Sequence, residues 1–178
     1  MSENTFNPFE DRLSRDIRNT LSSALAGAIE TGNDDVLDSV LTRYQARELP
    51  DYCRDYVRDR SLRYRKALSA LQKGGDDPII YRSLILWDLG LFFEVHEVLE
   101  HAWYAAKGDM KQTLQALIRA AGVYIKLEYG YIPEAEKIAL KSLAVLRENR
   151  SILSLYFEPQ RLISALSKLQ PAPPKLLE

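Results

Sequence analysis

Two histidines and three carboxylates share one short run of this chain, from Glu94 to His101, with the sequence EVHEVLEH. Imidazole and carboxylate side chains can bind divalent metals, exchange protons with a substrate, or form buried hydrogen-bond networks. Large apolar residues flank the run on both sides, so we expect the fold to place these polar groups at the edge of a core. Polar groups in such a place need hydrogen bonds, a metal or a partner. The run is therefore the main candidate site.

A helical wheel predicts how deeply each of these side chains lies. Successive residues of a helix turn by about 100°, which predicts a half-buried cluster. His96 and Glu100 form its inner pair, Glu97 is intermediate, and Glu94 and His101 lie nearest water. Residues four apart are neighbours on a helix surface, so His96 can meet Glu100 and Glu97 can meet His101.

Three interpretations of the cluster remain open. The one that we favour is a buried polar network that fixes helix packing. The second is a divalent-metal site, for which the candidate ligands are His96, Glu97, Glu100 and His101. The third is a histidine–carboxylate pair that acts as a general acid or base. The run departs from the zinc signature H-E-x-x-H, because Glu100 stands where the second histidine belongs.

Two residues outside the run are predicted to complete the polar site. Arg60 falls in the middle of the apolar face of an expected helix, where it could form a salt bridge to Glu97 or Glu100. The alternative for Arg60 is a side chain whose charged end reaches water at the rim of the core. Gln115 can both donate and accept hydrogen bonds, which suits it to bridge a carboxylate and an imidazole. The alternative for Gln115 is an ordinary solvent-facing side chain.

The elements that must position these residues are predicted to be helices. Apolar residues recur every three to four positions along the chain, which predicts an all-α fold. Capping residues, glycines and prolines set the expected ends of the helices. The expected helices cover residues 7–32, 34–48, 51–73, 79–89, 91–106, 109–129, 133–149 and 159–169.

The loop Gly74–Pro78 is the expected boundary between two regions. Residues 1–75 are predicted to form an N-terminal helical extension, and residues 78–170 an antiparallel helical bundle that carries the cluster. The proline-rich segment 171–178 is predicted to be a frayed tail.

Composition narrows the class of protein. Apolar residues make up 46% of the chain and charged residues 28%, and the formal net charge is −1. We therefore expect no membrane segment and no nucleic-acid binding, and we interpret the arginines between Arg43 and Lys66 as a solvated face that pairs with nearby aspartates. The single cysteine, Cys53, and the charged first twenty residues are typical of a cytoplasmic protein without a signal peptide.

The cluster and its surroundings resemble a known family. The segment Leu89–Trp103 is similar to the hallmark of the family catalogued as domain of unknown function 309, a glycine and an aromatic residue followed by Glu-x-His-Glu-x-x-Glu and a tryptophan. Lys111, Gln115 and the small-residue run Ala120–Tyr124 correspond to its continuation. The resemblance covers about residues 80–150 and implies an all-helical bundle with these polar residues facing inward. It implies no activity.

Two classes of function follow from the sequence. The leading one is a non-enzymatic structural or interaction module whose inward cluster is a structural polar network or a site for a small ligand or partner, including a protein partner or a second copy of the chain. The alternative is a metal-dependent, hydrolase-like enzyme that uses the His/Glu cluster with a divalent metal.

Overall fold

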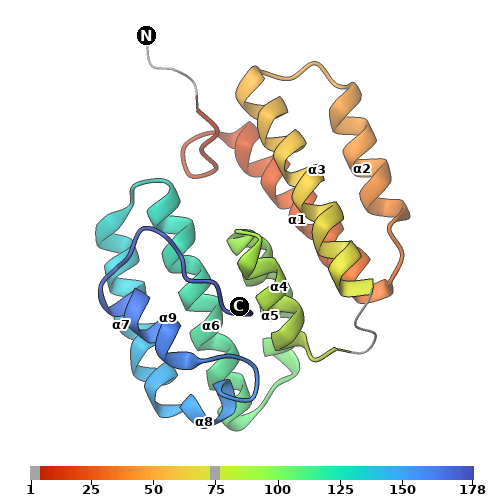
Figure 1. The fold of residues 1–178 in the computed structure, drawn as a ribbon. Coiled ribbons are helices and arrows are strands. Elements are labelled where there is room, and N and C mark those ends of the chain that lie inside the picture. The colour runs from red at the N-terminus through yellow and green to blue at the C-terminus, as the bar shows by residue number, and fades with distance from the viewer. Residues whose placement is uncertain (1–4, 73–76) are drawn as a thin grey trace. The chain divides into compact units, whose positions relative to one another are not determined.

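The computed structural model describes residues 5–72 and 77–178, and every regular element within these ranges is an α-helix, as Figure 1 shows. The all-α prediction is confirmed. By its internal contacts the chain divides into two compact units, residues 1–73 and residues 74–178. The residues Gly74, Gly75 and Asp76 of the expected boundary loop lie outside the described ranges.

The N-terminal unit contains helices α1 (Arg12–Thr31), α2 (Asp35–Ala46) and α3 (Asp51–Gln72), and each packs against the other two. The first helix begins later than the sequence predicted. Asp11 caps it by accepting a hydrogen bond from the backbone N–H of Ser14 at 2.9 Å. Asn7 instead forms a turn, in which its side-chain oxygen accepts from the N–H of Phe9 at 3.0 Å. The helix ends at Gly32, whose φ of 70° suits glycine.

The C-terminal unit contains six helices within the described residues. Short connections of two or three residues join the first four, so neighbours in sequence run antiparallel. Helix α6 packs against both α5 and α7, α4 packs against α5, and α9 packs against α7. The helices are α4 (Ile79–Asp88), α5 (Phe92–Ala105), α6 (Gly108–Glu128), α7 (Ile132–Glu148), α8 (Arg150–Leu153) and α9 (Pro159–Ser167).

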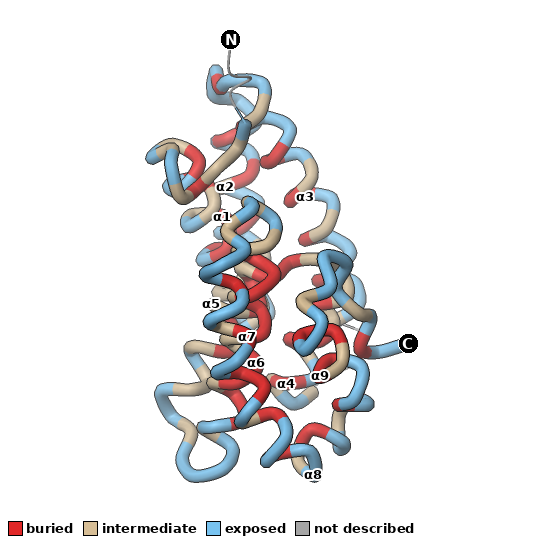
Figure 2. The backbone as a smooth tube through the Cα atoms, turned by 90° about the vertical axis from the view of Figure 1, so that its left-hand side faces the viewer, coloured by how far each residue is buried: buried red, intermediate tan, exposed pale blue. Residues whose placement is uncertain are grey.

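The core of this unit follows the apolar periodicity of its helices. Buried residues recur along α5, α6 and α7 in Figure 2, where they are drawn in red. Small residues let α6 and α7 approach closely: Ala116, Ala120 and Ala139 are all buried. The buried hydroxyl of Ser142 donates to the backbone oxygen of Ala116 at 2.8 Å, which ties the two helices together.

The prediction of a frayed tail after Pro171 is wrong. Trp87 donates from its indole N–H to the backbone oxygen of Pro174 at 2.8 Å, and Leu176 is buried with 3% of its surface exposed. The segment therefore packs on the end of α4. Its proline content excludes a helix but not an extended conformation held by tertiary contacts.

None of the helices in the described ranges combines the length and apolar character needed to cross a membrane.

Candidate functional site

Helix α5 positions the His/Glu cluster. Gly90 turns the chain between α4 and α5 with a φ of 72°, which favours glycine. Val95, Val98 and Leu99 are buried and fix one side of α5 in the core. Residues on the adjoining side are consequently held at the core edge, with their polar ends accessible.

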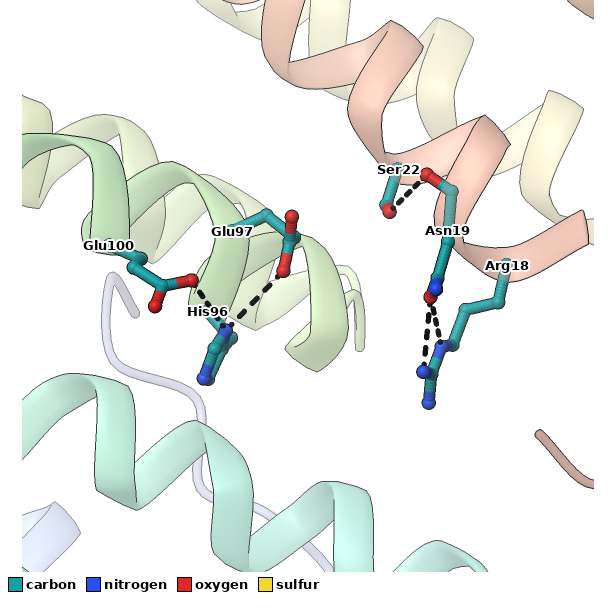
Figure 3. A network of polar contacts seen from close by, with 6 residues as sticks. All are labelled: Arg18, Asn19, Ser22, His96, Glu97 and Glu100. Carbon is teal, nitrogen blue, oxygen red and sulfur yellow. Dashed lines mark hydrogen bonds and ion pairs between the residues drawn. The ribbon is translucent and has the colours of Figure 1, made fainter. Parts of the chain in front are cut away.

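His96, Glu97 and Glu100 converge at this edge. His96 Nδ1 lies 3.5 Å from Oε1 of Glu97 and 3.8 Å from Oε2 of Glu100, as the dashed lines of Figure 3 show. One ligand atom from each residue lies within 4.8 Å of the other two. Among the described residues, this trio is the group of histidine, cysteine and acidic side chains with the spacing of a metal site. We call these three residues the α5 cluster.

The α5 cluster is half-buried. The side chains of His96, Glu97 and Glu100 are 32%, 34% and 41% exposed. Glu100 is thus the most exposed of the three, whereas the helical wheel assigned it to the inner pair. The ring of Phe93 stacks on the imidazole of His96, with 6.2 Å between centroids and 9° between planes, and so restricts the orientation of that ring.

The charges of the α5 cluster do not balance. Within the described part of the chain, neither Glu97 nor Glu100 forms an ion pair with a lysine or arginine, and His96 Nδ1 is buried without a hydrogen bond. Two carboxylates at this separation repel each other unless the imidazole is protonated or a cation lies between them. The arrangement is suited to receive positive charge.

Two other acid or base residues of α5 lie outside the cluster. His101 is exposed and is not among the three residues with metal-site spacing. Glu94 was predicted to lie nearest water, and this is wrong, because its exposure is 0%. A helical wheel gives the angular position of a side chain but not how far other elements cover the first turn of a helix, where Glu94 lies.

Gln115 and Arg60, which were predicted to complete the polar site, lie on helices other than α5. Gln115 is half-buried on α6, which packs against α5. Arg60 belongs to α3 of the N-terminal unit, where its Nη1 donates to Asp59 Oδ2 at 2.8 Å and its guanidinium lies 4.6 Å from the centroid of the Tyr56 ring. The participation of Gln115 and the salt bridge from Arg60 to Glu97 or Glu100 stay predictions.

The sequence identified the aromatic residues that flank the α5 cluster but not their contacts with other helices. Trp103 follows His96 by two helical turns, and Lys111 places its Nζ 4.3 Å from the centroid of the indole ring. Tyr124 lies between Trp87 and Phe92, with centroids 5.4 and 5.3 Å away, and burial raises its pKa to about 12. The spacing of seven residues between His96 and Trp103 puts both on one helix face, as the helical wheel predicted.

The comparison with protein families agrees with the residues of α5. Residues 80–138 match the model of the family described as domain of unknown function (DUF309). The matched segment is similar to that domain. It spans α4, α5 and α6 and the start of α7, and it includes the whole α5 cluster together with Lys111 and Gln115. The resemblance inferred from the sequence is confirmed.

The other comparisons add no relative. No curated protein and no solved structure matches the chain significantly. Because the matched family is described only as a domain of unknown function, the DUF309 match carries no activity to this chain, and it does not support a hydrolase.

Proposed function

We propose that the DUF309 domain of this chain is a non-enzymatic binding module whose α5 cluster binds one divalent cation. The observation that carries the proposal is the convergence of His96 Nδ1, at 3.5 and 3.8 Å, on two carboxylates that have no other ion pair among the described residues. A divalent cation would satisfy both carboxylates and the imidazole nitrogen at once.

The donor set indicates the class of cation. One imidazole nitrogen and two carboxylate oxygens suit Zn²⁺ or Mn²⁺ better than Ca²⁺, which prefers oxygen ligands alone. A small adjustment is needed, since metal–ligand bonds of about 2.0–2.2 Å require the ligand atoms to lie about 3–3.5 Å apart. Glu97 and Glu100 are 34% and 41% exposed, so their side chains can make that adjustment.

We propose cation binding at the α5 cluster and no catalysis. Glu100 in place of a second histidine removes the two-histidine arrangement of zinc proteases, and the cluster contains no serine or cysteine. A structural polar network is the competing interpretation, in which His96, Glu97 and Glu100 fix the packing of the helices.

Calorimetric titration of the tag-free full chain with ZnCl₂ and with MnCl₂ distinguishes a cation site from a structural polar network. We expect saturable binding of one cation, weakened at least about tenfold in His96→Ala, which corresponds to about 1.4 kcal/mol of binding free energy. His101→Ala is the matched control, because this histidine lies on the same helix but is exposed and outside the cluster. It should bind as the wild type does.

Absence of saturable binding to the wild type contradicts the proposal. Equal weakening in His96→Ala and His101→Ala contradicts it too, because the cation would then bind histidine non-specifically. A large loss of stability in His96→Ala, combined with no cation binding to the wild type, supports the structural network instead.

A further inference from the structure

The end of α4 holds the chain's own segment 171–178 by its main chain. The Asp88 carboxylate accepts two successive backbone N–H groups, from Leu176 to Oδ1 at 2.8 Å and from Leu177 to Oδ2 at 2.9 Å. One residue earlier, Trp87 Nε1 donates to the backbone oxygen of Pro174 at 2.8 Å. These three hydrogen bonds involve no side chain of the segment, so they bind an extended peptide as such.

The side chains of the segment add one apolar anchor and one charge. Leu176 is buried with 3% of its surface exposed, whereas Lys175 and Leu177 on either side of it are exposed. The Lys175 ammonium group donates to the backbone oxygen of Asp88, at the C-terminal end of α4. A cation is favourable there because the helix dipole places partial negative charge at that end.

Leaving Trp87 and Asp88 without a bound peptide costs free energy. With the segment in place Trp87 is only 3% exposed, so its indole ring gains contact with water if the segment leaves. Asp88 is a carboxylate at the last position of a helix, where the helix dipole disfavours negative charge. Both costs are offset by the hydrogen bonds to the segment, which is what a peptide-binding site requires.

The join between α9 and the segment is under backbone strain. Leu169 adopts a φ of 46°, a left-handed conformation that disfavours residues with a side chain. Three prolines at 171, 173 and 174 keep the following stretch extended, which lowers the entropy cost of binding it. The segment therefore resembles a preorganised linear ligand on a strained connection more than a part of the helical core.

We propose that Trp87 and Asp88 form a peptide-binding site for a segment of the class Pro-Pro-basic-Leu-Leu carried by another protein. The chain's own residues 173–177 have this sequence and occupy the site in the absence of that partner. The hydrogen bonds from Trp87 and Asp88 to the main chain give affinity, and the burial of the first leucine gives specificity. The tethered segment competes because tethering raises its effective concentration to about the millimolar range.

The test uses the full chain with its own segment disabled. Leu176→Asp buries a carboxylate beside that of Asp88 and leaves Trp87 and Asp88 themselves unchanged. The probe is a fluorescently labelled peptide with the sequence of residues 171–178, PAPPKLLE, and the measurement is fluorescence anisotropy. Circular dichroism checks that each variant is folded.

We expect saturable binding of this peptide to the Leu176→Asp chain. Binding to the wild type should be at least about tenfold weaker, because the tethered segment competes. Binding to the double variant Asp88→Ala/Leu176→Asp should also be at least about tenfold weaker, because two charge-assisted hydrogen bonds are lost. A peptide with aspartate in place of the first leucine is the matched control and should not bind.

Two results would overturn the proposal: no binding to the folded Leu176→Asp chain, or equal binding to the single and double variants. Trypsin cleavage after Lys175 gives an independent check on the full chain. Docking should slow cleavage in the wild type relative to Leu176→Asp and Asp88→Ala, and equal cleavage rates in all three would also overturn it.

Discussion

Asp59 on α3 and Glu97 on α5 are both partly exposed carboxylates, with 43% and 34% of their side-chain surface accessible. Asp59 lies between two arginines, with Arg60 Nη1 at 2.8 Å and Arg63 Nε at 3.0 Å. Glu97 has only the imidazole of His96 at 3.5 Å, which it shares with Glu100. Asp59 therefore pairs with two arginines, whereas Glu97 and Glu100 share one imidazole.

This difference separates a structural helix surface from a candidate site. On α3, further pairs such as Arg58–Asp55 at 3.6 Å follow the three- and four-residue spacing of a helix, and each contributes little stability. On α5 the same spacing brings together two glutamates and a histidine, for which we propose an external cation. Local sequence spacing looks alike in both units, and the balance of charge distinguishes them.

The largest expected effect tests whether the two units depend equally on their apolar cores. Leu21→Ala in α1 and Leu99→Ala in α5 each remove a leucine with 0% exposure. Each should lower the free energy of unfolding by about 2–5 kcal/mol. Urea denaturation measures the loss, and hydrogen exchange by mass spectrometry assigns it to one unit. A loss below about 1 kcal/mol in one unit would show that its core is loosely packed.

Alkaline pH is expected to destabilise the C-terminal unit. Burial raises the pKa of Tyr124 from its ordinary value of 10.0 to about 12, so its neutral phenol stabilises the fold fully below pH 10. That stability is lost as pH rises from 10 towards 12, by up to about 2–3 kcal/mol. Tyr124→Phe should abolish this loss in urea denaturation at pH 8 and pH 11.

The exposed Tyr104 provides the control for that measurement, because 69% of its surface is accessible. Tyr104→Phe should keep the alkaline loss of the wild type. An unchanged loss in Tyr124→Phe would show that the burial of the Tyr124 phenol is not the cause of the alkaline loss.

Acid pH is expected to affect the N-terminal unit instead. Hydrogen bonds from the Ser14 hydroxyl and backbone N–H lower the pKa of Asp11 below its ordinary value of 3.8. The ionised cap therefore stabilises α1 fully above that value, and this contribution is lost as pH falls through the lower pKa of the folded state. Asp11→Ala should cost about 1 kcal/mol at pH 7 and should reduce the acid dependence.

Asp16 is the control for the capping prediction. It lies on the same helix, is 61% exposed, and makes only a 3.8 Å contact with Arg12. Asp16→Ala should leave both the stability at pH 7 and its acid dependence nearly unchanged. If Asp16→Ala and Asp11→Ala behave alike, the cap is not the source of the effect.

The smallest expected effect is on the free energy of unfolding when one carboxylate is neutralised, and its sign differs between the two units. Asp59→Asn removes attraction to two arginines and should destabilise the chain by about 0.5–1 kcal/mol. Glu97→Gln, measured in EDTA, removes repulsion from Glu100 and should leave stability unchanged or raise it by up to about 0.5 kcal/mol. Destabilisation by Glu97→Gln similar to that by Asp59→Asn would favour a structural network at the α5 cluster.

Most helix positions could be predicted because local signals determine them. Apolar spacing, glycines and prolines place α5 at Phe92–Ala105 where the sequence predicted 91–106, and α3 at Asp51–Gln72 where it predicted 51–73. The start of α1 could not be predicted as well, because Asn7 and Asp11 are both good capping residues. Only the packed structure selects Asp11, which bonds to the N–H and hydroxyl of Ser14.

The candidate site could be predicted in its residues but not in its environment. Spacing on one helix sufficed to bring His96, Glu97 and Glu100 together. Contacts between distant residues could not be predicted from the sequence. The burial of Glu94 and the docking of Leu176 on the end of α4 depend on packing in three dimensions. A pattern of helical periodicity contains no information on such contacts.

The most direct test of the α5 cluster follows the imidazole signals of the full chain by NMR during titration with ZnCl₂. The chain contains two histidines, so His101 serves as an internal control for His96 in the same molecule. The account predicts that the His96 signals change and saturate at one equivalent of Zn²⁺, while the His101 signals stay in place. Unchanged His96 signals, or equal changes in both histidines, would contradict it.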